Sequence, residues 1–123
     1  MKNAFTILTV LMMAIIFACN NYPKTEYSTS ETKSFLKVSP NTTELELKLI
    51  AEEFKQKRNI DIDYSKSIFF DDGKIEDLVL KVNSNDGYFG ETTSSRYSLR
   101  MKSFGFVRDF SKNAKSEFMI GAF

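Results

Sequence analysis

The 123-residue chain contains no histidine and a single cysteine, Cys19. Without histidine, neither Ser-His nor Cys-His catalysis is available, and the commonest ligand of zinc sites is missing. One cysteine cannot form an intrachain disulfide, so the folded part of the chain must be stabilised by its packing alone. These absences leave carboxylates as the remaining candidates for catalysis.

An excess of charge of one sign is also lacking. The chain has 17 basic and 16 acidic residues, and Lys2 is the only charged residue before Cys19. A chain that begins at Cys19 therefore has 16 residues of each sign and a net charge of zero. This neutrality gives no general attraction to nucleic acid, so we expect no nucleic-acid partner. No segment after Cys19 is long and apolar enough to span a membrane.

The N-terminal segment has the layout of a secretory signal. Lys2 precedes a 15-residue apolar run over residues 4–18, which is shorter than the about 20 residues of a membrane span. The run ends at Ile16-Phe17-Ala18-Cys19, which resembles the lipobox of bacterial lipoproteins, where the cysteine thiol carries diacylglycerol. We therefore predict a signal peptide over residues 1–18 and lipidation of Cys19. The alternative is an uncleaved N-terminal helix with an incidental cysteine.

A polar stretch follows the predicted lipid attachment site. Residues 19–33 are rich in serine and threonine and show no apolar periodicity. This composition predicts a flexible tether that leads to a folded domain over residues 34–123. Fully extended, residues 20–33 would hold that domain up to about 45–50 Å from its lipid.

The clearest element of the domain is a helix that begins near Thr43. Thr43 and Glu46 have the spacing of a capping box, with Asn41 and Glu44 as the competing register. Asn59 suits the left-handed conformation that ends many helices. Apolar residues at helical spacing, which we expect to face the sheet, are Leu47, Ile50, Ala51 and Phe54.

Alternation of apolar and polar residues predicts β-strands in the rest of the domain. The predicted strands cover residues 35–38, 60–70, 78–82, 97–101 and 118–122, with a Gly- and Thr-rich loop over 87–95. The element order is β-α-β-β-β-β. The predicted fold class is α+β, with one N-terminal helix packed on a mostly antiparallel sheet of four to five strands.

The segment NTTELELKLIAEEFKQKRNIDIDYS (41–65), followed by DGKIEDLVLKV (72–82), resembles a small exported domain of Gram-negative bacteria. That domain occurs at the periplasmic end of sensor-type membrane metallopeptidases related to β-lactam-sensing antirepressors, and in stand-alone lipoproteins. SFGFVRD (103–109) continues the resemblance. The resemblance implies export, membrane association and a sensory role. The metallopeptidase part with its zinc-binding helix is absent from this sequence, so no catalytic residue is carried over.

Acidic residues form two groups in the sequence. Asp61 and Asp63 share a predicted strand face, where paired carboxylates could cleave glycosides or hold calcium. The spacing of a calcium loop fails, because Ser65 and Lys66 stand where a third ligand and a glycine are required. A deep pocket shared with Asp77 would favour an enzyme. We interpret the acids as a solvated strand face and an ordinary turn, the latter carrying Asp71, Asp72, Glu76 and Asp77.

Residues 96–115 are locally basic, because Asp109 is their only acid. Arg96, Arg100 and Lys102 share one face of the predicted strand and could contact anionic lipid headgroups or an acidic partner. The alternative is that they pair across strands with the acidic region 61–77.

The chain has 12 phenylalanines, and three of them fall close together at Phe104, Phe106 and Phe110. They are too closely spaced for all three to point inward from a strand. One hypothesis is an exposed apolar patch for a partner, and the alternative is a place in the core.

These features predict a non-catalytic binding or sensory module, lipid-anchored at the cell envelope of a Gram-negative bacterium and free of metal and cofactor. The predicted partners are the membrane, through the lipid on Cys19, and an envelope protein. Its predicted contact residues are Arg96, Arg100, Lys102, Phe104 and Phe106. The alternatives are a small carboxylate-dependent envelope hydrolase and an immunity-like inhibitor of a partner enzyme. A flat sheet with an open edge near residues 118–122 would favour the binding module.

Overall fold

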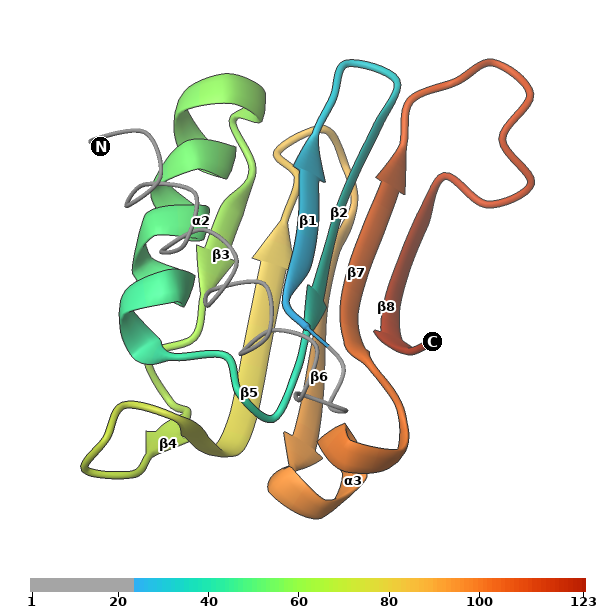
Figure 1. Ribbon diagram of the computed structural model, residues 1–123. Coiled ribbons are helices and arrows are strands. Elements are labelled where there is room, and N and C mark those ends of the chain that lie inside the picture. The colour runs from blue at the N-terminus through green and yellow to red at the C-terminus, as the bar shows by residue number, and fades with distance from the viewer. Residues whose placement is uncertain (1–23) are drawn as a thin grey trace, which may run out of the picture.

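The computed structural model describes residues 24–123 as a small, mostly β domain with two helices (Figure 1). The predicted signal peptide and Cys19 lie outside the described residues. One antiparallel sheet has the order β1-β2-β7-β8 and consists of β1 (Glu26–Thr29), β2 (Lys33–Val38), β7 (Phe104–Asp109) and β8 (Phe118–Ala122). The second sheet is built around β5 and consists of β3 (Asp61–Asp63), β4 (Ile68–Phe69), β5 (Ile75–Asn83) and β6 (Phe89–Ser95). The helices are α2 (Glu44–Arg58) and α3 (Arg96–Met101).

Helix α2 forms as the sequence predicts. The Thr43 side chain accepts a hydrogen bond from the Glu46 backbone N–H, and the Glu46 carboxylate accepts one from the Thr43 backbone N–H. This capping box satisfies two N–H groups that the helix cannot bond internally. Asn59 ends the helix in the left-handed conformation, with φ of 53°. The predicted burial of Leu47, Ile50 and Phe54 is confirmed.

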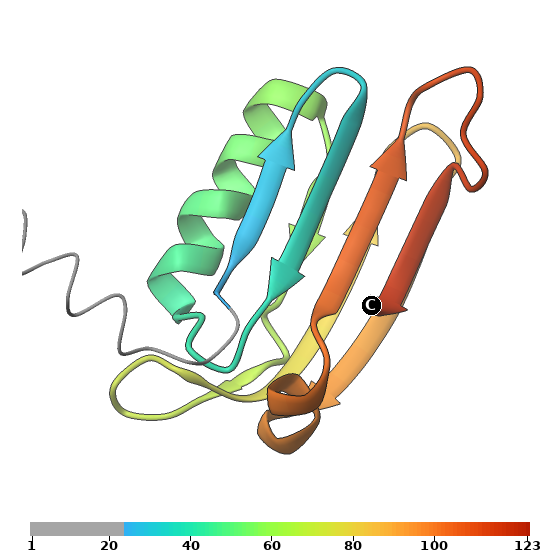
Figure 2. The same cartoon turned by 45° about the vertical axis from the view of Figure 1, so that its right-hand side comes forward.

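The core lies between the two sheets and is closed along one side by α2. The sheet that contains β2 and β7 contributes Leu36, Val38 and Phe106, all fully buried. From α2, the Phe54 ring packs 5.3 Å from the Phe106 ring, measured between centroids. Figure 2 shows α2 beside β1 and next to β3, so the helix touches an edge of each sheet. The second sheet contributes the β5 side chains Ile75, Leu78, Leu80 and Val82.

The predicted combination of helix with antiparallel strands is therefore confirmed, whereas the predicted single sheet covered by a helix is not. The domain combines antiparallel strands with helix, but the strands divide into two sheets, and α2 lies along their side. The strands divide into two sheets because no strand of one sheet pairs with a strand of the other in the described chain. Residues 33–38 of β2 pair with β7 near the end of the chain, whereas β5 pairs with its sequence neighbours.

The predicted strand over residues 97–101 is wrong, because these residues form α3. Ser95 caps this helix by accepting a hydrogen bond from the Ser98 backbone N–H. Leu99 alone is buried, whereas Tyr97 and Met101 are 73% and 71% exposed. The apparent alternation over 97–101 thus does not mark one buried face. The predicted loop over 87–95 is also wrong, because most of it is β6, paired with β5 from Asp77↔Ser95 to Asn83↔Phe89.

The predicted flexible tether over residues 19–33 is wrong for residues 26–29, because they form β1. This strand pairs with β2 from Glu26↔Lys37 to Thr29↔Ser34. Two contacts hold it against α2. The Tyr27 ring lies 6.2 Å from the Phe54 ring, and Arg58 Nε donates to the Thr29 carbonyl at 2.8 Å. The sequence of β1 is EYST, in which Tyr27 is the only hydrophobic residue, so no apolar alternation marks it as a strand. Within residues 24–123, no helix has both the length and the apolar character needed to cross a membrane.

Candidate functional site

Arg96 begins α3 and is held in place by the backbone of two distant segments. Its Nη1 donates to the Pro40 carbonyl at 2.6 Å and to the Ile75 carbonyl at 3.1 Å. Its guanidinium also lies 5.5 Å from the centroid of the Phe70 ring, within cation–π range. Of the three predicted basic contact residues, Arg96 therefore has a structural role, because it joins the start of α3 to the β2–α2 loop and to β5.

Arg100 and Lys102 instead face solvent, and no ion pair to either is found among residues 24–123. The predicted alternative of cross-strand pairing with acids is therefore not seen for them. Apolar side chains stand exposed beside them. Four residues, which we call the α3 surface, make up this mixed cationic and apolar area: Tyr97, Arg100, Met101 and Lys102.

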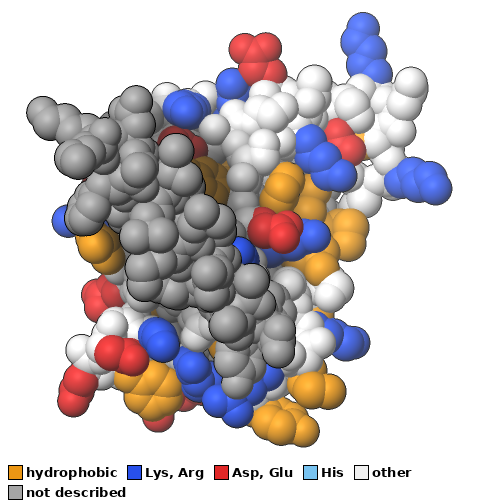
Figure 3. All heavy atoms as spheres, viewed as in Figure 1, with side chains coloured by type: hydrophobic (Ala, Val, Ile, Leu, Met, Phe, Trp, Pro, Cys, Tyr) orange, Lys and Arg blue, Asp and Glu red, His pale blue; other side chains and the backbone are white. Residues whose placement is uncertain are grey.

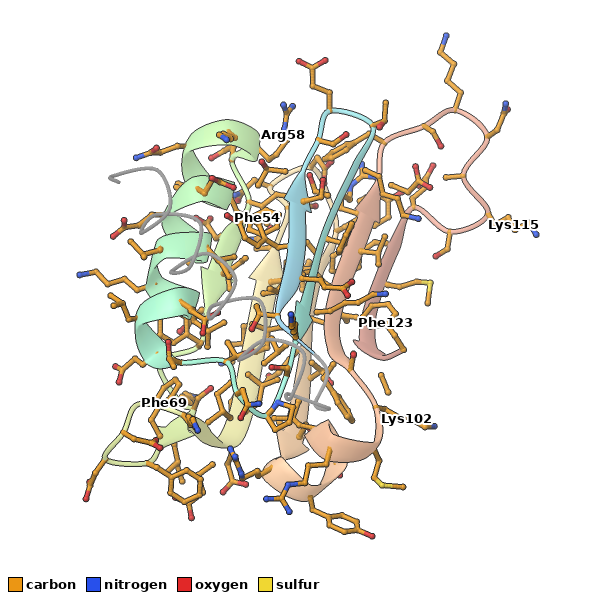
Figure 4. All side chains as sticks on the ribbon, in the orientation of Figure 1. Phe54, Arg58, Phe69, Lys102, Lys115 and Phe123 are labelled. Carbon is orange, nitrogen blue, oxygen red and sulfur yellow. The ribbon has the colours of Figure 1, made fainter. Side chains whose placement is uncertain are left out.

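The α3 surface lies at one end of the domain. Figure 4 labels Lys102 and Phe69 at the lower end of the view, with Arg58 at the upper end and Lys115 well above Lys102. Figure 3 shows Lys and Arg side chains next to hydrophobic ones along the same lower end. Because β7 starts after α3 and runs upward to residues 110–117, that loop lies away from the α3 surface.

The predicted phenylalanine patch is wrong for Phe106, which is fully buried between the rings of Phe54 and Phe118. Phe104 is half-buried and packs against the same core. Phe110 is 37% exposed and stacks on the guanidinium of Arg108, with 4.4 Å between that group and the ring centroid. Of the predicted contact residues, only Arg100 and Lys102 are thus freely exposed.

Asp61 and Asp63 lie on the outer face of the β5 sheet, beside an open hollow of about 460 Å³. Glu91, on β6, also lines this hollow, whereas Asp77 lies beside a different one. The Lys55 ammonium, 2.8 Å from Asp61, and a hydrogen bond from Asn85 hold the pKa of Asp61 below its ordinary value.

The neighbouring carboxyl is perturbed in the same direction. Hydrogen bonds from the side chain and backbone of Ser65 lower the pKa of Asp63. A pair of glycosidase carboxylates needs one member with a raised pKa to act as the general acid. Neither Asp61 nor Asp63 meets that requirement.

The remaining predicted acids fit the expected turn. Asp72 Oδ1 accepts a hydrogen bond from the Lys74 backbone N–H, and Gly73 adopts φ of +87°. Asp71 and Glu76 are exposed. In the described part of the chain, no three acidic or cysteine side chains come together closely enough to hold a metal ion.

Strand β8 is an open edge of its sheet within the described residues, because it pairs only with β7. The Asp109 N–H donates to the Glu117 carbonyl, and the Phe123 N–H donates to the Ser103 carbonyl. Antiparallel bonding alternates, so odd-numbered residues of this strand bond to β7. The N–H and C=O groups of Phe118, Ile120 and Ala122 therefore face outward along the edge.

A second open edge lies next to it. Ser84 N–H donates to the Tyr88 carbonyl, so the even-numbered residues of β6 bond to β5 and the odd-numbered ones face outward. The two edges approach at Gly90, where an added Cβ would lie 2.6 Å from Ile120 Cγ2. One side of the domain thus presents two free edges, β6 and β8 (Figure 2).

A hollow of about 570 Å³, not predicted from the sequence, lies on the outer face of the β1-β2-β7-β8 sheet. Its lining includes the apolar residues Phe35, Val107 and Met119 and the basic residues Lys33, Lys37 and Lys115. Figure 3 looks onto this face and shows hydrophobic side chains together with basic and acidic ones there. The alternation KSFLK at residues 33–37 carried the signal, since it places Lys33, Phe35 and Lys37 on one strand face.

No protein-family model, curated protein or solved structure matches this chain. The candidate sites therefore stand on their own geometry.

Proposed function

We propose that this protein is an exported lipoprotein whose domain binds a partner protein at the cell envelope and carries out no catalysis. The observation that carries the proposal is the open edge of β8. Its sequence, FMIGA, contains no charged residue and no proline. Natural edge strands are usually protected from pairing by such residues. An extended segment of a partner could add to β8 by bonding the outward backbone groups of Phe118, Ile120 and Ala122.

Two features support placement at the envelope. Ile16-Phe17-Ala18-Cys19 resembles a lipobox, and the first strand of the described residues begins seven residues after Cys19, at Glu26. A lipid at Cys19 would confine the domain near one membrane and raise its effective concentration toward partners there. An immunity-like role is a form of the same proposal, in which the segment bound at β8 belongs to an enzyme.

The proposal is tested by co-purification of the full-length protein from solubilised envelope. Ile120→Pro removes an outward N–H, and we expect it to abolish capture of the partner. Met119→Ala, on the same strand, leaves every edge N–H in place and serves as the matched control. Because Ile120 also packs against the core, Ala122→Pro provides a second, exposed edge change. Retention of the partner by both folded proline variants would contradict binding at β8.

A small hydrolase is the second candidate, because Asp61, Asp63 and Glu91 line one hollow. The lowered pKa values of Asp61 and Asp63 weigh against acid–base catalysis there. Hydrolysis of a glycan or peptide by purified protein, lost in Asp61→Asn, would favour the hydrolase over the binding module.

A further inference from the structure

The start of the described chain and α3 are joined by a short series of hydrogen bonds. Thr25 Oγ1 lies 2.5 Å from Thr42 Oγ1, and the Thr42 carbonyl accepts from the Ile75 N–H at 3.2 Å. The Ile75 carbonyl in turn accepts from Arg96, the first residue of α3, at 3.1 Å. The chain therefore enters the domain at the end that carries the α3 surface.

The number of residues before that entry point limits where a lipid on Cys19 can lie. Cys19 is six residues before Thr25, so the two Cα atoms are at most about 20 Å apart. This limit of about 20 Å is under half of the about 45–50 Å that residues 20–33 could span if all of them were an extended tether. The following inference rests on the proposed lipid at Cys19, because that lipid brings the bilayer to this end of the domain.

The side chains at this end suit the surface of an anionic bilayer. Tyr97 and Met101 are 73% and 71% exposed. Exposed aromatic and apolar side chains of this kind insert at the level of lipid headgroups. Arg100 and Lys102 stand beside them with no acidic partner among residues 24–123, and cations near the bilayer are attracted to anionic lipids.

The distribution of charge also indicates which part of this end faces the lipid. Asp71 and Asp72 occupy the β4–β5 turn, which lies at the opposite side of the lower end from α3 in Figure 1. The helix and its C-cap, residues 96–102, contain no acid. Asp77 of β5 lies opposite Ser95, at the start of the helix, whereas Arg100 and Lys102 are at its other end. Attraction to anionic headgroups therefore favours contact through α3, with the acidic turn farther from the bilayer.

We propose that the α3 surface rests on the anionic bilayer that holds the lipid of Cys19. The contact fixes the orientation of the domain. Strand β7 then leads away from the membrane toward the loop at residues 110–117, and the open edges of β6 and β8 extend from the membrane outward. In this orientation the β8 edge stays accessible to a partner in the same envelope.

The orientation can be measured with the full-length lipidated protein in vesicles of phosphatidylethanolamine and phosphatidylglycerol. Acylation blocks the Cys19 thiol, so Met101→Cys introduces the only reactive thiol, and a fluorophore is attached there. Asn113→Cys, in the exposed loop beyond β7, gives the matched control. Nitroxide-labelled lipids should quench the fluorophore at position 101 at least about twofold more than at position 113. Equal quenching at the two positions would overturn the proposal.

Charge reversal tests the electrostatic part of the contact. The double change Arg100→Glu and Lys102→Glu should lower quenching at position 101 to the level at position 113. The matched change Lys112→Glu and Lys115→Glu, in the loop at residues 110–117, should leave the quenching at position 101 unchanged. Quenching that appears in native envelope membranes but not in the pure vesicles would overturn the proposal and indicate a protein contact instead.

Failure of the anchor can be told apart from failure of the contact. The wild-type protein, with Cys19 as its only cysteine, should take up no thiol-reactive fluorophore. Uptake by the wild type would show that the thiol is free, which contradicts the lipid anchor itself. No uptake by the wild type, combined with equal quenching at positions 101 and 113, would contradict only the α3 contact.

Discussion

The guanidinium of Arg108 donates from both Nε and Nη2 to Oδ2 of Asp86, at 3.1 and 2.7 Å. Arg108 is on β7 and Asp86 is in the β5–β6 turn, so the pair joins the two sheets across one end of the core. The Arg108 side chain is only 11% exposed and is stacked between the rings of Tyr88 and Phe110. Its Nη1 donates to the carbonyls of Asp109 and Glu117.

This pair predicts a pH dependence of stability. Burial raises the pKa of Asp86, but hydrogen bonds from Arg108 and Ser84 outweigh it and leave the pKa below its ordinary value. A carboxyl with a lowered pKa stabilises the fold above its unfolded pKa of about 4, and that stability is lost as pH falls through the folded pKa. Asp86→Asn should lower the free energy of unfolding by about 1–2 kcal/mol at pH 7. This value is modest because the Asp86 side chain is 36% exposed.

The check is urea unfolding followed between pH 7 and pH 2. The difference between wild type and Asp86→Asn should shrink below about pH 4, whereas Asp61 and Asp63 leave some pH dependence in both. Glu91→Gln, a change at an exposed carboxylate without an ion pair in the described chain, is the control. A constant difference across this pH range would contradict the role of the ion pair.

The second prediction concerns the packing of α2 against the β1-β2-β7-β8 sheet. Phe54 is fully buried and its ring packs against those of Phe106 and Tyr27. Phe54→Ala should lower the free energy of unfolding by about 3–5 kcal/mol. Leu49→Ala lies on the same helix but removes a side chain that is 56% exposed, so it should change stability by less than about 0.5 kcal/mol. Similar costs for the two variants would mean that α2 does not close this core.

The third prediction concerns the close approach of β6 and β8. A Cβ at Gly90 would lie 2.6 Å from Ile120 Cγ2, so Gly90→Ala should destabilise the domain by about 1–3 kcal/mol. Ile120→Ala removes the Cγ2 atom that would clash. The double variant Gly90→Ala with Ile120→Ala should therefore be more stable than the sum of the two single losses predicts. Strict additivity in chemical denaturation would argue against this contact.

A stronger effect is expected at Gly105, because the obstacle there is backbone. A Cβ at this position would lie 1.8 Å from the Leu36 carbonyl oxygen. Gly105→Ala should therefore prevent β2 and β7 from pairing in their present register. Loss of the folded signal in circular dichroism checks this, and a folded variant of near-normal stability would contradict it.

The elements that the sequence predicted correctly are those with a complete local signal. Helix α2 is flanked directly by its capping residue Thr43 and its stop Asn59, and its apolar stripe is unbroken. Strand β5 was found by its alternating apolar residues and by the turn before it. In both cases the deciding residues lie within a few positions of the element.

The elements that were missed depend on distant partners. Helix α3 is six residues long and contains one buried residue, Leu99, too little to establish a helical period. The role of Arg96 depends on the carbonyls of Pro40 and Ile75, and the pairing of Arg108 with Asp86 spans 22 positions. No local pattern reports such contacts, so the exposed and buried members of the basic region could not be separated from sequence.

The last prediction concerns the N-terminal limit of the domain. The sequence placed this limit at residue 34, whereas the structure adds β1 and its contacts with α2. A chain that begins at residue 24 should therefore be more stable than one that begins at residue 34. The shorter chain loses the Tyr27 ring over Phe54 and the Thr29 carbonyl that accepts from Arg58.

Removing β1 also exposes the edge of β2 to solvent. We expect a loss of about 2–4 kcal/mol, from a large aromatic side chain and a hydrogen bond to a charged group. Tyr27→Ala in the longer chain should reproduce part of that loss. Glu31→Ala, in the exposed turn after β1, should have almost no effect, because surface ion pairs such as its 3.9 Å contact with Arg58 contribute little. Equal stability of the two chains in urea would return residues 26–29 to the predicted tether, and the proposed lipid on Cys19 would then no longer be restricted to the α3 end.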